Sequence, residues 1–199
     1  MLSKVIERPT SEAKIKQHLD SMDEDMDWVY EVPFLTTIEN QLRAFQIKIN
    51  HNILYTNYQL FKWGIVENEN CTFCNQQTET LVHIFCKCAK IQNLWLNIVI
   101  QFGNIFDRKP SETEILLGMK YNDTVTPKLR MANHILLLAK HFIYSCRGKN
   151  NQPVFQNFVN CLKEKERLEY YIAKRNNKLQ IHEEKWDLTR IKFRQITSD

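Results

Sequence analysis

Four metal-binding side chains with a defined spacing constrain the fold of this 199-residue chain more than any other feature. Cys71 and Cys74 are followed by His83 and Cys88, which gives the pattern C-x2-C-x8-H-x4-C. The sequences ENEN and NQQTET flank the first pair and are too polar for two thiols buried in a core. Zinc prefers four sulfur or nitrogen donors in a tetrahedron. The spacing therefore predicts a structural Zn2+ site whose filled Cys3His shell leaves no open position for catalysis.

Cys86 leaves the identity of the fourth ligand open, because it lies only three residues after His83. We favour Cys88, since Ile84 and Phe85 of the segment HIFCKC are expected to pack inward and to leave Cys86 beside the site. Two further cysteines, Cys146 and Cys161, fall within helical patterns and lack a partner at metal-ligand spacing. We expect them to be buried thiols.

Apolar residues recur at intervals of three and four along most of the chain, which is the period of an amphipathic helix. A capping box, Thr36-x-x-Glu39, is expected to start the first strong helix. Helices are predicted over about 37–52, 56–63 with Thr56 as N-cap, and 91–102. A second capping box, Ser111-x-x-Glu114, is expected to start a short helix. Two long helices follow, over 126–148 with Thr126 and Gly148 as caps and from Pro153 onward. No segment alternates as a convincing strand does. The prediction is an all-α fold with at most one short β-hairpin at the cysteines.

Charge is distributed unevenly along the sequence. Residues 1–33 have a net charge of −4, residues 34–127 are neutral, and residues 128–199 have a net charge of +8. We interpret 1–33 as an acidic linker with a weak helix near 11–20, and 187–199 as a tail. Between them lies a helical zinc-binding domain, 34–186, with its zinc motif at 71–88 and long basic helices at 126–186. The basic excess at the C-terminal end favours a polyanionic partner.

Several classes of protein are disfavoured by the composition. The longest apolar run, 135–139, is far shorter than the roughly 18 residues of a membrane span, so no membrane partner is expected. The N-terminal sequence MLSKVIERPTSEAK lacks an apolar signal segment, which favours an intracellular protein, in the nucleus and/or cytoplasm, with reduced thiols. The chain has 4 glycines, spaced too far apart to form a nucleotide-binding glycine motif.

The segment around the cysteines resembles the zinc-binding domain that follows the polymerase in non-LTR (LINE-type) retrotransposon reverse transcriptases. Four features recur in order: a helix with Phe and Lys three residues apart, the ILYTNYQLFKWGI stretch, CTFC, and ETLVHIFCKC followed by a Trp. Here they lie at 45–48, 53–65, 71–74, and 79–88 with Trp95. The later stretches ANHILLLAKHFIYSCR and LEYYIAKRNNKLQIHEEKW are also similar to the end of such polyproteins. The resemblance covers residues 34–186.

This resemblance implies a non-catalytic role. The family's polymerase requires an aromatic-x-Asp-Asp motif to hold metal ions, and this chain has no Asp-Asp pair. An unrelated enzyme built on Cys146 and His141 is the poorest alternative, because nothing in the sequence orients the two side chains. The resemblance implies instead that the domain holds template RNA or target DNA near the polymerase. Its partners would be RNA and/or DNA and, as a further candidate, the polymerase part of the same element.

Basic residues of the zinc region and of the C-terminal third are the candidate phosphate contacts. They are Lys62, Lys87, Lys90, Arg130, Lys140, Arg147, Lys149, Lys174, Arg175 and Lys178, with His141 beside them. Tyr170, Tyr171 and Trp186 are candidates for stacking on bases, whereas Trp63 and Trp95 are expected in the core. The competing hypothesis is a zinc-stabilised helical protein-interaction module that does not bind nucleic acid.

Overall fold

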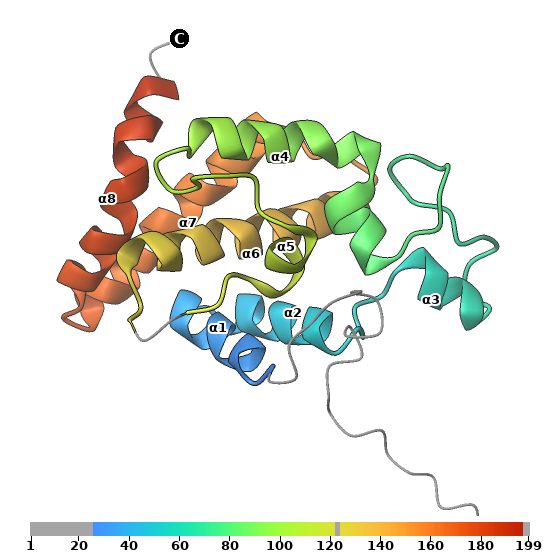
Figure 1. Ribbon diagram of the computed structural model, residues 1–199, viewed down its shortest axis with the longest axis horizontal. Helices are drawn as coiled ribbons and strands as arrows, with labels where there is room; N and C mark the ends of the chain where they lie inside the picture. Colours follow the sequence, from blue (N-terminus) through green and yellow to red (C-terminus); the bar gives the residue numbers. More distant parts are fainter. Residues whose placement is uncertain (1–25, 122–123, 197–199) are drawn as a thin grey trace, which may run out of the picture.

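The computed structural model describes residues 26–121 and 124–196, with side chains to Thr189, and the elements of regular structure in these ranges are helices joined by loops (Figure 1). The helices are α1 (Trp28–Thr36), α2 (Asn40–Asn50), α3 (Asn57–Lys62), the π-helical turn η2 (His83–Lys87), α4 (Ala89–Gln101), α5 (Glu112–Leu117), α6 (Pro127–Gly148), α7 (Phe155–Arg175) and α8 (Leu179–Ile196). The β structure in the described residues is a single isolated antiparallel bridge between Asn70 and Thr78. The predicted all-α class is confirmed.

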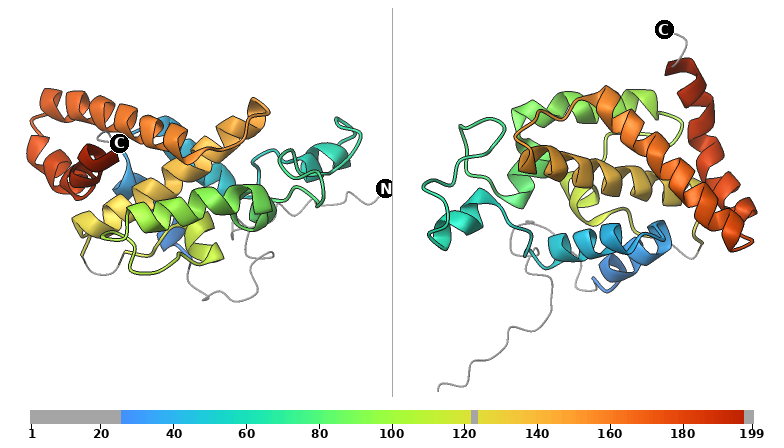
Figure 2. Two further views of the ribbon diagram at one scale, coloured as in Figure 1. Left: turned by 90° about the horizontal axis from the view of Figure 1, so that it is seen from above. Right: turned by 180° about the vertical axis from the view of Figure 1, so that it is seen from behind.

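Helix α6 forms the centre of the bundle, with α1 and α2 along one side and α4, α7 and α8 on the others (Figures 1 and 2). As predicted, the Thr126 hydroxyl caps it by accepting the Leu129 N–H at 3.2 Å, and Pro127 occupies the first turn. Its middle, residues 131–140, is buried on every side. The helix ends differently from the prediction, because Gly148 is still helical and Asn150 takes the left-handed conformation with φ 53°.

Two further local predictions can be followed at the level of side chains. The Ser111 hydroxyl accepts the Glu114 N–H at 3.2 Å, and the Glu114 carboxylate accepts the Ser111 N–H at 2.8 Å, so the capping box at the start of α5 is complete. Trp95 of α4 is buried as expected, and its indole N–H donates to the Phe85 carbonyl at 2.8 Å. This bond fixes α4 to the π-turn that precedes it.

The capping box expected at Thr36-x-x-Glu39 is wrong. Thr36 is the last residue of α1, and its hydroxyl hydrogen-bonds that of Tyr121 at 3.1 Å. The Glu39 carboxylate forms an ion pair with Lys165 of α7, and α2 begins only at Asn40 without a side-chain cap. A tertiary ion pair across the bundle has therefore replaced the local cap.

Both ends of the folded region extend beyond the expected boundaries. Helix α1 lies partly inside the predicted acidic linker, because Val29 and Val32 are buried against the bundle. The prediction of a tail from residue 187 is wrong for residues 187–196, because α8 continues to Ile196 and packs on α6 and α7. The weak helix expected near 11–20 lies outside the described residues. None of the described helices is long and apolar enough to cross a membrane.

Candidate metal centre

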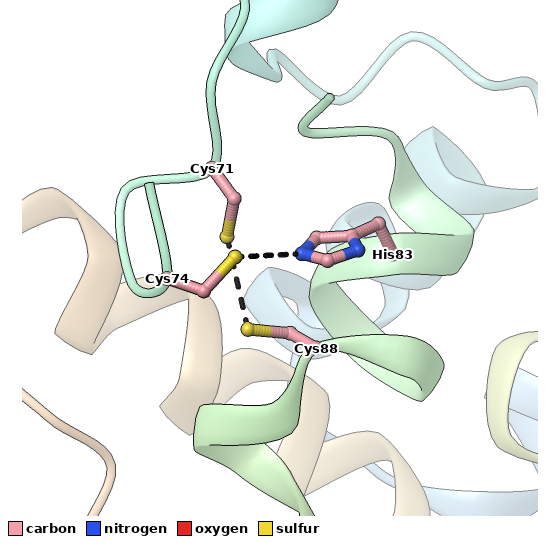
Figure 3. A group of neighbouring side chains, drawn as sticks. All are labelled: Cys71, Cys74, His83 and Cys88. Atoms are coloured by element: carbon pink, nitrogen blue, oxygen red, sulfur yellow. Dashed lines mark hydrogen bonds between the residues drawn. The ribbon is translucent and has the colours of Figure 1, made fainter. Parts of the chain in front are cut away.

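The structure brings together the four side chains that the sequence singled out (Figure 3). The ligand atoms of Cys71, Cys74, His83 and Cys88 all lie within 4.8 Å of one another. The Sγ atoms of Cys71 and Cys88 are 3.8 Å apart, and Cys74 Sγ lies 3.4 Å from His83 Nε2. Zinc bonds of about 2.3 Å to sulfur and 2.0–2.1 Å to nitrogen would, in a tetrahedron, separate two sulfurs by about 3.8 Å and sulfur from nitrogen by about 3.6 Å. The arrangement fits a Cys3His zinc site.

Cys86 points away from this cluster. Its thiol is buried 3.8 Å from the carbonyl oxygen of Glu112, at the start of α5. Burial raises its pKa to about 12, which keeps it a neutral thiol. The geometry therefore selects Cys88 over Cys86 as the fourth member of the site.

The first pair of ligands sits on a short knuckle, residues 71–78. The Cys71 N–H donates to the Gln77 carbonyl, and the Asn75 N–H donates to the Cys71 carbonyl, each at 2.8 Å. Asn75 adopts the left-handed conformation with φ 53°, which asparagine tolerates better than most residues. The bridge between Asn70 and Thr78 closes the knuckle. Both thiols are thereby turned toward the same point.

The second pair of ligands depends on the π-turn η2. The Cys88 N–H donates to the His83 carbonyl at 2.8 Å, a bond that spans five residues. On a regular α-helix two side chains five residues apart would point about 140° away from each other. The wider π-turn takes up the additional residue and brings both side chains to one side. Sequence reasoning missed this turn, although the x4 spacing between His83 and Cys88 is the signal that indicates it.

Burial and hydrogen bonds shift the pKa values of the residues in the cluster. Burial, with smaller contributions from Cys88 and Cys74, raises the pKa of Cys71 to about 12. Burial also acts to raise the pKa of Cys74, but hydrogen bonds from the backbone of Gln76 and Gln77 outweigh it, and that pKa is lowered. Burial lowers the pKa of His83, so the imidazole is neutral and can donate a lone pair. A metal ion binds cysteine as the thiolate and histidine as the neutral ring, so its binding would displace the remaining thiol protons.

A buried carboxylate anchors the knuckle to the bundle. Glu79 is fully buried, and its two oxygens accept the N–H groups of Thr72 at 2.8 Å and Asn57 at 2.9 Å. The guanidinium of Arg147, from the end of α6, donates to the same carboxylate at 2.7 Å and to the Asn57 side chain at 2.8 Å. Arg147, predicted as a phosphate contact, is thus committed to holding the knuckle and α3 in place. No sequence pattern had indicated this role for Glu79.

The other predicted phosphate contacts separate into exposed and enclosed groups. Seven are exposed: Lys62, Lys87, Lys90, Lys149, Lys174, Arg175 and Lys178. Lys140 was a wrong prediction, because it is buried and its ammonium donates to the Gln46 side chain at 2.5 Å and to the Leu116 carbonyl at 2.7 Å. Arg130 is half-buried, and His141 packs edge-on against the Phe45 ring with centroids 5.1 Å apart.

Two tryptophans differ from their predicted burial. Trp186, expected to stack on bases, is fully buried, and its indole N–H donates to Glu169 at 2.8 Å. Trp63, expected in the core, is 57% exposed. Tyr171 is exposed and Tyr170 is half-buried against His182. A helical spacing indicates which residues share a face, but not whether that face is covered.

The pair imagined as a nucleophile and its base does not have the properties of one. Burial raises the pKa of the Cys146 thiol, whereas an activated cysteine needs a lowered one. Burial also lowers the pKa of His141, whose ring lies against Phe45.

Comparison with known proteins identifies the metal-binding part of the chain. No curated protein matches the sequence. Residues 14–95 match the family model described as zinc-binding in reverse transcriptase, and all four members of the cluster lie inside the match. Helices α5 to α8 lie beyond it. Over residues 14–95 the chain is therefore similar to the zinc-binding domain found in reverse transcriptase.

Proposed function

We propose that this chain is a non-catalytic, zinc-stabilised nucleic-acid-binding domain that holds template RNA or target DNA near the polymerase of a retrotransposon-type reverse transcriptase. The observation that carries the proposal is the family match over residues 14–95 together with the Cys3His cluster inside it. The matched family is a zinc-binding accessory of reverse transcriptase, which supports a role beside the polymerase rather than in its chemistry.

Zinc would have a structural role here. Cys71, Cys74, His83 and Cys88 would hold the ion, and a shell of four protein ligands leaves no place for a substrate or a reactive water. The bound ion would neutralise the crowded thiolates and supply folding free energy to the knuckle and η2.

The exposed cations supply the electrostatic basis for binding a polyanion. Lys174, Arg175 and Lys178 surround the turn from α7 to α8 and are all exposed. Lys62, Lys87 and Lys90 lie on the zinc-binding part of the chain and are also exposed. Such side chains bind phosphates with little sequence preference, and each phosphate contact releases counterions. Binding should therefore weaken steeply as salt increases.

The decisive experiment measures binding of the zinc-loaded chain to labelled single-stranded RNA, single-stranded DNA and duplex across a salt series, before and after chelation. Binding that weakens steeply with salt, and that is lost when chelation removes zinc, supports the proposal. Weak binding that does not vary with salt, for every nucleic acid, contradicts it.

A charge-matched pair of variants tests the basic C-terminal third. Changing Lys174, Arg175 and Lys178 to Glu should leave zinc content and helicity unchanged but weaken nucleic-acid binding. The control changes Lys109, Lys120 and Lys128 to Glu, which alters net charge equally at exposed or half-buried lysines elsewhere. Equal nucleic-acid affinities for the two triple variants would show that the turn between α7 and α8 is not part of the interface.

One observation favours the second candidate, a protein-interaction module. A hollow of about 460 Å3 lies among α1, α7 and α8, and Phe34, Ile38 and Ile181 on its rim are about half exposed. Contiguous exposed apolar residues often mark protein contacts. This candidate predicts a stable complex between the chain and the polymerase part of the same element. Ile181→Asp should disrupt that complex. The unmodified chain should not bind nucleic acid.

A further inference from the structure

We infer that a groove along α3 binds single-stranded nucleic acid, with unpaired bases stacked on Tyr55 and Trp63 and phosphates beside Lys48 and Lys62. The inference rests on the proposed function and assigns it a surface and a strand type. It also links the zinc centre to binding, because residues 77–78 of the knuckle line part of the groove and bound zinc would hold the knuckle in place.

The groove consists of two adjoining hollows. The first has a volume of about 810 Å3, and its lining includes Lys48, Tyr55, Tyr58, Lys62 and Trp63. The second, of about 390 Å3, shares Asn52, Tyr58 and Gln59 with the first and continues along the knuckle to His83 and Lys87. A single path therefore runs from Trp63 to the metal centre. Figure 1 shows α3 and the knuckle extending from one end of the helical bundle.

Helix α3 contributes little to the core. None of its six residues is buried, and the adjoining Tyr55 and Trp63 are 56% and 57% exposed. Large aromatic side chains gathered on an exposed surface are unfavourable in water unless a ligand covers them. Because α3 is held by Glu79 and Arg147 rather than by its own apolar side chains, these rings remain available.

The rings are arranged for stacking. Tyr55 and Trp63 lie edge to face, with centroids 5.6 Å apart and planes at 79°. This contact restrains both side chains before a ligand arrives, which reduces the entropy lost on binding. Aromatic faces accept every base, so they bind single strands with little regard to sequence.

The charges of the groove complement phosphate. Lys48 and Lys62 are exposed at the first hollow, and none of the described residues that line either hollow is acidic. The Lys62 ammonium lies 4.3 Å above the Tyr58 ring, which places a cation directly beside an aromatic face. At the far end Lys87 is exposed and only loosely paired with Glu112 at 3.4 Å. An alternation of cations and rings is the usual pattern of a single-strand site.

A duplex cannot use this surface in the same way, because its bases are already stacked on one another. The groove should therefore distinguish single strands from duplex, whereas the lysines at the turn between α7 and α8 bind phosphates of either form. This difference separates the two surfaces experimentally.

The test uses the zinc-loaded full chain with a labelled oligo-U, oligo-dT and duplex DNA of equal length. Trp63→Ala and Tyr55→Ala should each weaken single-strand binding about 5- to 100-fold and leave duplex binding within about twofold, from the usual effect of removing one stacking ring. Trp63→Phe should restore most of the affinity. Leu96→Ala, at an exposed apolar residue of α4 outside both proposed surfaces, is the control and should change nothing.

Fluorescence gives a second readout. Of the four tryptophans, Trp95 and Trp186 are buried and Trp28 is half-buried against the core. Quenching of tryptophan emission by oligo-U should therefore come mainly from Trp63 and should be lost in Trp63→Phe. Helicity and zinc content must match those of the unmodified chain, which is expected at so exposed a position.

The outcomes distinguish this inference from the proposed function. If the unmodified chain binds no nucleic acid at low salt, both are overturned. If it binds, and Trp63→Ala and Tyr55→Ala bind single strands as tightly as it does, the groove is overturned and the proposed function stands. Equal losses for single strands and duplex also overturn the groove as a stacking site. Loss of a complex with the polymerase part, without any loss of nucleic-acid affinity, overturns it in favour of a protein contact.

Discussion

The guanidinium of Arg147 donates to the carboxylate of Glu79 at 2.7 Å, with the two side chains only 13% and 0% exposed. The pair joins the last turn of α6 to the residue that precedes η2 by a few positions, across 68 residues of sequence. Glu79 also receives the N–H of Thr72, which lies between the two knuckle cysteines. The orientation of the metal centre relative to the helical bundle therefore depends on this ion pair as well as on zinc.

Arg147→Met should lower the free energy of unfolding by about 3–5 kcal/mol, because it leaves a charged carboxylate buried without its partner. Zinc affinity should fall as well, since the knuckle loses its anchor. Urea unfolding and competition with a zinc indicator measure the two effects. Lys149→Met removes a nearby exposed cation and should change neither quantity. An Arg147→Met chain as stable as the Lys149→Met chain would show that the pair is dispensable.

Cys74→Ser and Cys86→Ser should separate a zinc ligand from a buried thiol. We expect Cys74→Ser to lose its zinc ion and much of the structure around residues 71–88, because structural zinc supplies folding free energy directly. Cys86→Ser should retain one zinc ion per chain. Metal analysis and circular dichroism of both variants provide the measurement. Retention of zinc by Cys74→Ser, or its loss from Cys86→Ser, would contradict the assignment.

Lys140→Met and Lys178→Met should have opposite effects, although both residues were candidate phosphate contacts in the sequence. Lys140 is buried, and its removal leaves the acceptors on Gln46 and Leu116 with fewer donors, so stability should fall by about 1–3 kcal/mol. Its nucleic-acid affinity should stay within twofold of the unmodified chain. Lys178 is exposed, and its removal should leave stability unchanged and reduce the slope of log affinity against log salt by about 1. Salt titrations of the two variants compare these slopes, and a reduced slope for Lys140→Met would contradict the structure.

A buried polar cluster of α6, α7 and α8 should make the protein sensitive to acid. Burial, aided by Lys185, lowers the pKa of His134 from 6.5 to about 3. Burial opposes ionisation of Glu169, but His134, Lys185 and Trp186 outweigh it and hold its pKa at about 2 instead of 4.5. Below its ordinary pKa of 6.5, His134 is therefore protonated in the unfolded chain but stays neutral in the folded chain. Below its ordinary pKa of 4.5, Glu169 is likewise protonated in the unfolded chain but stays ionised in the folded chain. The free energy of unfolding should fall as the pH is lowered through this range.

His134→Gln isolates the first of these contributions. One proton of difference corresponds to about 1.4 kcal/mol per pH unit, so this variant should flatten the dependence of stability on pH between about 6 and 4.5 by up to that slope. The comparison is made on zinc-saturated samples of both chains, so that acid release of zinc affects them equally. An unchanged slope would show that His134 is protonated in the folded state.

Local patterns in the sequence were sufficient for the features that depend on neighbouring residues. The capping box at Ser111 and Glu114 and the start of α6 at Thr126 and Pro127 formed as predicted, because each involves groups within one helical turn. The spacing of Cys71, Cys74, His83 and Cys88 likewise indicated the metal cluster that the structure assembles. Interactions between residues close in sequence leave the backbone few alternative local conformations.

The tertiary structure decided which of these faces are covered and which partners a charge meets. Lys140 and Trp186 looked suitable for a nucleic-acid surface but are enclosed by helices distant in sequence, whereas Trp63 looked like core but is 57% exposed. Glu39 left its expected local cap to pair with Lys165. Burial and ion pairing depend on atoms brought together from far apart in the chain. The sequence by itself therefore determined most of the helices and the four side chains of the candidate metal centre, and the packing of the bundle determined which residues remain exposed to a partner.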